Sequence, residues 1–138
     1  MNENFSKKPV TQGHPMGCAV ACVAYISGTQ YDDAWQFFDS QSSAYNSGYY
    51  CPDIVQALKR AGLSSYKYKE IKKDITLLEK KNSIVFCNYC PQYPSGHYLA
   101  KSDSGWMNPW INYPRIDPAE SGIIKDLPSR PTWIIYNI

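Results

Sequence analysis

The longest apolar stretch of the chain extends from Met16 to Ile26 and ends before Gly28. A run of this length that mixes Ala, Met and Val favours a helix over a strand. Because its residues are apolar on every side, we expect a helix buried at the centre of the fold, with Pro15 in its first turn. The fully apolar part, 18–26, is well short of the roughly 20 residues that span a bilayer, so we expect no membrane insertion.

A second helix is predicted from Thr29, because Asp32 is placed to complete a capping box. Its larger apolar side chains recur at helical spacing: Tyr31, Trp35 and Phe38. A third helix is predicted to follow Cys51-Pro52, with Ile54, Leu58 and Ala61 turned inward and a stop at Gly62. The first half of the chain therefore has the pattern of a helical layer.

The second half of the chain changes to the patterns of strands. Five segments show them: 66–70, 84–87, 97–101, 106–110 and 132–138. The third and fourth segments form a predicted hairpin, and a short helix from Asp74 to Leu78 separates the first two. We expect one α+β domain over residues 1–138, with N-terminal helices packed on a C-terminal antiparallel sheet and residues 1–10 as a loose leading segment.

Composition excludes some classes of partner and leaves the predicted fold class unchanged. The chain has 138 residues, of which 43% are hydrophobic and 19% are charged, as in folded globular domains. Fourteen Lys and Arg against twelve Asp and Glu give a net charge of +2, too small to indicate nucleic acid or an anionic membrane. The polar N-terminus lacks an apolar signal core, and five cysteines cannot all pair. We therefore expect reduced thiols in a cytoplasmic protein, with export as an effector left open.

The first candidate for chemistry is Cys18, in the first turn of the predicted central helix. Unpaired backbone N–H groups and the helix dipole favour an anion there, so we expect a lowered pKa for this thiol. Gln12 lies six residues earlier and is placed to form an oxyanion hole with the backbone N–H of Cys18. We expect Gly17, and Gly96 in the second half, to leave room for the backbone of a substrate.

The candidate base is His97, at the start of a predicted strand, with Asn108 on the return strand of the same hairpin. If the turn is centred near Asp103, positions 97 and 108 fall opposite each other within about two residues. The amide would then fix the imidazole tautomer and leave the other ring nitrogen facing the thiol. Trp106 and Trp110 share the face of Asn108 on a strand, where an indole would shield this bond from water.

Three other residues are alternatives within this set. His14 is closer in sequence to Cys18, but it lies in the loop before the helix and has no amide partner at strand spacing. Asp103 and Asp117 are alternatives to Asn108, although Asp103 lies at the predicted turn. We expect His97 and Asn108 to be the functional pair.

Cys87 and Cys90 form a rival C-x-x-C motif, which Cys51 and His97 would complete as a zinc site. A structural zinc site usually contains a second close pair of ligands, and the sequence has none. We therefore expect neither a metal nor another cofactor.

The order of four residues is similar to that of the papain-like cysteine peptidases: Gln12, Cys18, His97 and Asn108. It most closely resembles the double-glycine leader peptidases, which process bacteriocin precursors. Those enzymes carry a Gln six residues before a helix-borne Cys, then a Gly-His-aromatic strand and an Asp-Pro. This chain has Gly96-His97-Tyr98 and Asn108-Pro109. It differs from the family in having Asn in place of Asp, and Gly and Ala on the two sides of the Cys.

The resemblance implies a papain-like fold and hydrolysis of a peptide or ester bond through an acyl-enzyme on Cys18. Because no transporter or ATPase segment follows within these 138 residues, we expect the papain-like mechanism more firmly than leader cleavage. Two alternatives stay open. An amine acceptor would make the protein an acyl transferase, and a module without catalysis would hold a peptide with its aromatic loop: Tyr45, Tyr49 and Tyr50.

Overall fold

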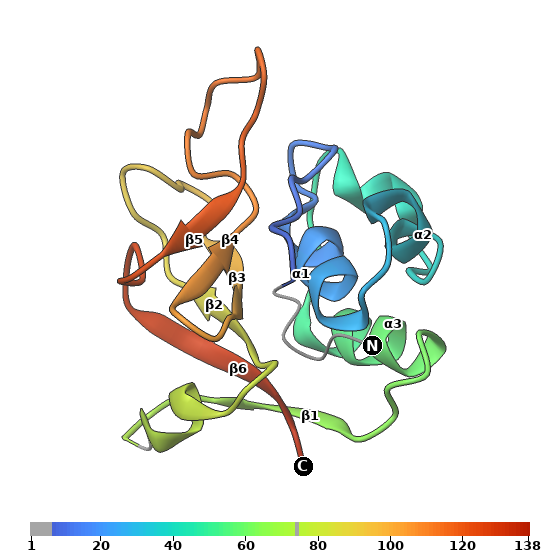
Figure 1. Ribbon diagram of the computed structural model, residues 1–138, viewed down its shortest axis with the longest axis vertical. Helices are drawn as coiled ribbons and strands as arrows, with labels where there is room; N and C mark the ends of the chain where they lie inside the picture. The colour runs from blue at the N-terminus through green and yellow to red at the C-terminus, as the bar shows by residue number, and fades with distance from the viewer. Residues whose placement is uncertain (1–6, 74) are drawn as a thin grey trace.

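A layer of helices packs against one face of a six-stranded antiparallel sheet, as the α+β prediction requires (Figure 1). This computed structural model describes residues 7–73 and 75–138, so the predicted leading segment lies partly outside the described residues, as does Asp74. The helical elements are α1 (Cys18–Ser27), α2 (Tyr31–Trp35), the 3-10 helix η1 (Gln41–Ala44), α3 (Cys51–Arg60) and the 3-10 helix η2 (Ile75–Glu79). The strands are β1 (Tyr66–Glu70), β2 (Ile84–Cys87), β3 (His97–Lys101), β4 (Trp106–Asn108), β5 (Gly122–Ile124) and β6 (Pro131–Asn137).

Helix α1 is the buried central helix that its sequence predicts. Every residue from Ala19 to Ile26 is buried, because the helix lies between the sheet and the other helices. The helix ends at Gly28, whose φ of 73° is the left-handed conformation that glycine adopts without strain. It begins at Cys18 rather than Met16, so the prediction that Pro15 occupies its first turn is wrong.

Helix α2 is shorter than predicted, and its predicted capping box does not form. Gln30 is the residue that precedes the helix, and the hydroxyl of Thr29 instead bonds that of Ser27 at 3.0 Å. Helix α3 begins at Cys51 and so includes Cys51 and Pro52, which were predicted to precede it, and its Asp53 carboxylate accepts the backbone N–H of Tyr50 at 2.9 Å. This bond satisfies one of the unpaired N–H groups near the start of α3.

The sheet has the strand order β1-β6-β2-β3-β4-β5, and every neighbouring pair is antiparallel. The predicted ranges of β1, β2 and β3 match the structure, whereas β4 ends at Asn108 rather than Trp110. Strand β5 was not predicted, because three residues are too few to show an alternating pattern. The C-terminal strand β6 lies between β1 and β2, where Ile134 and Ile135 are fully buried.

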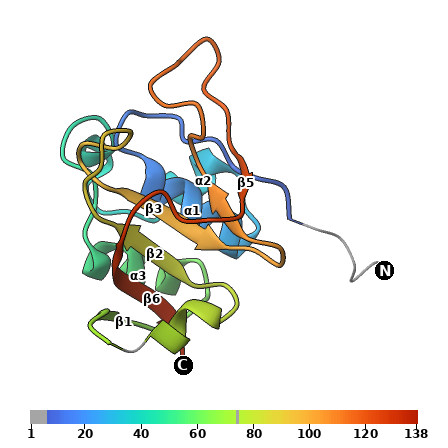
Figure 2. The same ribbon diagram turned by 90° about the vertical axis from the view of Figure 1, so that its left-hand side faces the viewer.

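Apolar side chains cover both faces of the sheet. Ile84, Ala100 and Ile135 face the helices, and their neighbours Val85, Leu99 and Ile134 form a second cluster on the other face. Figure 2 shows this second face of the sheet, with the helical layer behind it. No helix in the described ranges has both the length and the apolar character that a bilayer span requires.

Candidate active site

The β3–β4 hairpin brings the predicted base and its orienting amide into contact. Ala100 pairs with Met107 and Lys101 with Trp106, which places Asn108 diagonally across from His97. The His97 Nε2 lies 2.8 Å from Asn108 Oδ1, and both side chains are buried. This hydrogen bond has the partners that the hairpin register predicts.

Neighbouring hydrogen bonds determine which atom donates in this pair. The backbone N–H of Trp110 donates to Asn108 Oδ1 at 3.0 Å, so this atom is the amide oxygen and accepts. His97 Nε2 must therefore carry the proton of the His97–Asn108 bond. The other ring nitrogen, Nδ1, is then the one without a proton in the neutral imidazole, and it is free to act as a base.

Tyr93 supports this pair and was not identified from the sequence. Its ring stacks on the His97 imidazole, with centroids 3.9 Å apart and planes 3° from parallel. Its hydroxyl accepts a hydrogen bond from Asn108 Nδ2 at 3.0 Å and donates to the Trp110 carbonyl at 2.7 Å. Tyr93 lies in an irregular Pro-rich loop, where no periodicity or spacing rule points to it.

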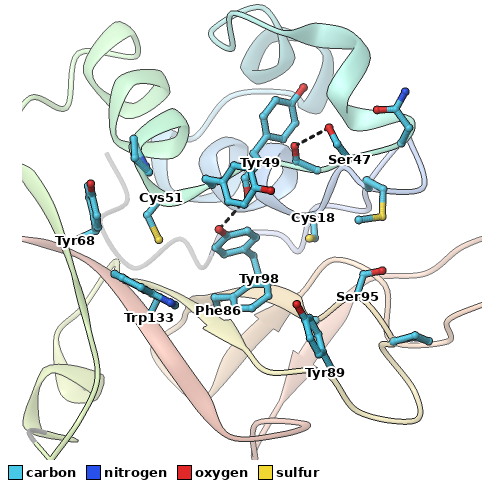
Figure 3. Close-up of a pocket in the computed structure, with 17 residues that line it drawn as sticks. Cys18, Ser47, Tyr49, Cys51, Tyr68, Phe86, Tyr89, Ser95, Tyr98 and Trp133 are labelled. Carbon is cyan, nitrogen blue, oxygen red and sulfur yellow. Dashed lines mark hydrogen bonds between the residues drawn. The ribbon is translucent and has the colours of Figure 1, made fainter.

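Cys18 is the first residue of α1 and lies half-buried where two cavities meet. The larger cavity, of about 730 Å³, lies between the helical layer and the sheet (Figure 3). The smaller one, of about 160 Å³, is lined by Cys18 together with Gln12, His97 and Tyr93. The structure thus gathers the predicted nucleophile, base and oxyanion donor around one small space, with Asn108 bonded to the base.

Gln12 is buried at the wall of the smaller cavity. Its backbone N–H donates to the Pro109 carbonyl at 3.2 Å, which fixes it next to the β4 end. Its side-chain Nε2 donates to the carbonyls of His14 and Pro15 at 3.0 and 3.1 Å. The Oε1 atom is buried and has no hydrogen-bond partner among the described residues. The amide therefore faces the loop in this structure, rather than the space above Cys18.

Burial sets the protonation of the two reactive groups. It raises the pKa of the Cys18 thiol to about 11, although backbone N–H groups of Tyr98, Ala19 and Cys18 itself favour the thiolate. Burial also lowers the pKa of His97 to about 4, against the opposing effect of its Asn108 bond. The predicted lowering of the thiol pKa is therefore wrong for this structure, because desolvation outweighs the helix N-terminus. With these pKa values, both the thiol and the imidazole are uncharged at neutral pH.

The two glycines predicted to face the substrate have different surroundings. The space where a Cβ of Gly17 would lie is taken by the hydroxyl of Tyr31, so this glycine is required by internal packing. Gly96 lines both cavities, but its φ is 79° and a Cβ there would meet the ring of Phe86. The structure thus gives a packing reason for Gly17 and a conformational reason for Gly96, and their expected place beside a substrate stays a prediction.

The imidazole of the alternative base and the side chains of the alternative orienting residues do not line the smaller cavity. His14 Nδ1 lies 2.9 Å from the Tyr31 hydroxyl, and its ring contacts Trp35 and Tyr45 at centroid distances of 4.3 and 4.5 Å. Its described contacts are thus with the loop and α2. Asp103 is exposed at the hairpin turn, and Asp117 is exposed in the loop after β4, so neither replaces Asn108.

Cys51 lies apart from the other residues of the rival zinc motif. Cys51 is the first residue of α3 and lines the larger cavity, whereas Cys87 is buried with Val85 on the far face of the sheet. Within residues 7–73 and 75–138, no three metal-ligating side chains form a group that could hold an ion. The four residues of the zinc alternative therefore do not assemble into a site.

Over the described residues, three α-helices pack on a six-stranded antiparallel sheet with a cysteine at the start of the buried helix, which is a papain-like fold. Among solved structures, it is similar to the peptidase domain of Streptococcus ComA, described as a bifunctional ABC transporter involved in a quorum-sensing pathway. The TM-score is 0.57 and the identity 17%, over 94% of this chain and 96% of that domain. At this identity the likeness establishes the fold alone. No family model matches the sequence, and no curated protein matches it significantly.

Proposed function

We propose that this protein is a thiol hydrolase that cleaves an amide or ester bond through an acyl-enzyme on Cys18. The observation that carries the proposal is the His97–Asn108 bond of 2.8 Å, in the wall of a cavity that Cys18 also lines. A nucleophile, a base and a group that orients the base are the parts that nucleophilic catalysis requires. The likeness to a peptidase domain supports a peptide or protein as the substrate.

The reaction begins from the neutral thiol and imidazole. As Sγ of Cys18 attacks the carbonyl carbon, its proton passes to Nδ1 of His97, because Nε2 is already bonded to Asn108. The imidazolium then returns this proton to the leaving nitrogen or oxygen as the bond to the carbonyl carbon breaks. In the second half, His97 takes a proton from water as the water oxygen attacks the thioester carbon. The imidazolium returns this proton to Sγ as the C–S bond breaks, which releases the acid and restores the thiol and the neutral imidazole. Atoms and charges balance without a cofactor.

The tetrahedral oxyanion is held by the backbone N–H of Cys18 and by the side chain of Gln12. Gln12 Nε2 now donates to the carbonyls of His14 and Pro15, so on this proposal it exchanges one of them for the oxyanion when substrate binds. Gln12 Oε1 is buried without a hydrogen-bond partner among the described residues, so the side-chain amide is not fully hydrogen-bonded in this position. This supports the proposed rearrangement.

Two finer versions and one alternative share this site. The resemblance in residue order favours a leader-peptidase-like specificity, and an amine acceptor in place of water would give an acyl transferase. The raised thiol pKa and the larger cavity also fit a module that binds a peptide without cutting it. A binding module would not depend on His97 for its function, whereas the hydrolase does.

The test is turnover of a pool of internally quenched peptides by a set of variants. Cys18→Ala should abolish turnover and His97→Ala should be nearly as severe, whereas Gln12→Ala should cost about 10²–10³-fold. Asn108→Asp should be tolerated, because a carboxylate also accepts the Nε2 proton. Cys90→Ala is the matched control, since Cys90 is also half-buried but lies outside both cavities. Full activity in Cys18→Ala, or loss in His14→Ala with His97→Ala spared, would refute the assignment.

A further inference from the structure

The larger cavity is a groove whose lining is aromatic and uncharged. It runs between the helical layer and the sheet, with Cys18 well separated from Tyr68 and Trp133 in Figure 3. Seven of its 17 lining residues are aromatic. None of the described residues that line it is Asp, Glu, Lys, Arg or His, although the chain has 26 charged side chains, 14 basic and 12 acidic. Such a surface favours apolar groups and penalises charged ones.

The rim of this groove is exposed. Four aromatic residues of the lining have accessible side chains: Tyr50, Tyr68, Tyr89 and Trp133. Tyr68 and Trp133 lie on the neighbouring strands β1 and β6, with ring centroids 6.2 Å apart. Exposed aromatic rings beside a hollow are typical anchors of a binding surface, because they bury large apolar area at low entropic cost.

The position of His97 determines which part of the substrate lies in which cavity. In the proposed reaction the imidazolium gives its proton to the leaving group, so the leaving group must lie beside His97. His97 lines the smaller cavity and not the larger one, whereas Cys18 lines both. The acyl part of the substrate, which bonds to Cys18, is therefore directed into the groove of about 730 Å³. The leaving group is left with about 160 Å³.

From this geometry we propose that the substrate is a peptide with bulky, uncharged apolar or aromatic residues on the acyl side of the scissile bond. A volume of 730 Å³ lies within the range of about 300–1,000 Å³ typical of ligand sites, so recognition rests mainly on this side. The small cavity accepts a short or narrow leaving group. This inference rests on the proposed function, and it adds the orientation in which the substrate binds and the chemical class of its side chains.

The first test compares quenched peptides that differ only in the residues on the acyl side. Peptides with Phe or Leu there should have kcat/KM values about tenfold or more above matched peptides with Asp or Lys, because the groove offers no counter-charge. Equal charge changes on the leaving-group side should have a smaller effect. Turnover with no preference, or with a preference for charged residues on the acyl side, would overturn this inference and leave the proposed function standing. No turnover of any peptide, with no acylation of Cys18, would instead count against the function itself.

The second test places one charge in the groove. Tyr68→Lys should raise kcat/KM for the peptide with Asp on the acyl side and lower it for the Leu peptide. The matched control is Ile116→Lys, which adds the same charge at an exposed position outside the groove lining and should change neither value. Identical behaviour of the two variants would contradict the proposed placement.

Aromatic platforms also bind sugars, so a soluble chitooligosaccharide serves as a competitor. It should not inhibit cleavage of the Leu peptide. Competitive inhibition that Trp133→Ala removes would assign the groove to a glycan and overturn the peptide assignment.

Discussion

Desolvation decides the charge of the two reactive side chains in the free protein. The helix N-terminus and nearby N–H groups favour a Cys18 thiolate, but burial holds the thiol pKa at about 11. Burial likewise holds the pKa of His97 at about 4. At neutral pH both groups are therefore uncharged, and the proton moves only when the thiol attacks.

This protonation state predicts the pH dependence of activity. His97 is protonated and inactive as a base only below about pH 4, and the thiol–imidazole pair loses its proton only above about pH 11. We therefore expect kcat/KM to rise through about pH 4 and to stay level through pH 9. Ultraviolet absorbance of thiolate at pH 7 should not differ between the natural protein and Cys18→Ala. A thiolate signal that disappears in that variant, with an alkaline limb near pH 8, would show a preformed ion pair instead.

Tyr93 is expected to act by positioning the His97–Asn108 pair. Tyr93→Phe keeps the stacked ring but removes the hydroxyl that bonds Asn108 Nδ2 and the Trp110 carbonyl. We expect kcat to fall about tenfold, because Asn108 loses one of the bonds that orient it. The pKa of His97, measured by nuclear magnetic resonance, should change as well.

The matched control is Tyr66→Phe, because Tyr66 is also buried and its hydroxyl donates to the Asn82 carbonyl at 2.8 Å, outside the lining of both cavities. This control should leave kcat and the His97 pKa unchanged. If Tyr93→Phe only lowers thermal stability and leaves kcat and the His97 pKa intact, Tyr93 is structural alone.

At the level of elements, the sequence predicted the structure correctly where a residue pattern was compatible with only one kind of helix or strand. An all-apolar run predicted that α1 is buried, alternation predicted β1, and the turn sequence 102–105 predicted the β3–β4 hairpin. Two predictions about elements failed for local reasons. Thr29 bonds Ser27 instead of capping α2, and β5 is too short to have a period. The hairpin register predicted the His97–Asn108 contact, but no pattern in the sequence gives the loop conformation that stacks Tyr93 on it.

The turn into β3 should depend on Gly96 for two separable reasons. Gly96→Ala places an alanine at a φ of 79° and brings its Cβ against the Phe86 ring. Gly28→Ala places an alanine at a similar φ of 73°, but nothing lies within 4 Å of the new Cβ. We expect Gly28→Ala to cost about 1–2 kcal/mol and Gly96→Ala about 1–3 kcal/mol more. Urea unfolding of both variants measures the difference. Equal losses would show that the Phe86 contact is relieved without cost.

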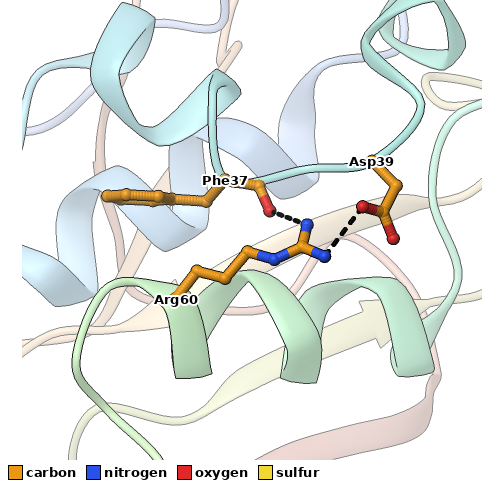
Figure 4. Close-up of polar contacts among 3 residues, drawn as sticks. All are labelled: Phe37, Asp39 and Arg60. Carbon is orange, nitrogen blue, oxygen red and sulfur yellow. Dashed lines mark hydrogen bonds and ion pairs between the residues drawn. The ribbon is translucent and has the colours of Figure 1, made fainter.

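Surface contacts between elements should matter much less. Arg60 of α3 donates to the Phe37 carbonyl and pairs with Asp39, each at 2.8 Å (Figure 4). The Asp39 side chain is 79% exposed, so solvent screens this ion pair. Arg60→Ala should therefore lower the unfolding free energy by less than about 1 kcal/mol in a urea titration. A loss above about 2 kcal/mol would show that this pair holds α3 in place.

Over the whole molecule, helices followed by strands predicted the α+β class, and the structure confirms it. The strand order was not predictable, because β6 pairs with β1 and β2 through contacts distant in sequence. For the same reason the groove could not be foreseen. Its lining comes from both layers and from loops, and it joins residues more than 100 positions apart in the sequence, such as Met16 and Trp133 of β6.

The central claim is that Cys18 carries an acyl group during turnover. Mixing the protein with an activated ester of a Phe-containing peptide, quenching in acid and measuring the intact mass tests it most directly. We expect one added acyl group, mapped to Cys18, that decays with time and is absent in Cys18→Ala. In His97→Ala it should form at a much lower rate. Product formation with the acyl group on Cys90, or with no acyl group on any cysteine, would show that Cys18 is not the nucleophile.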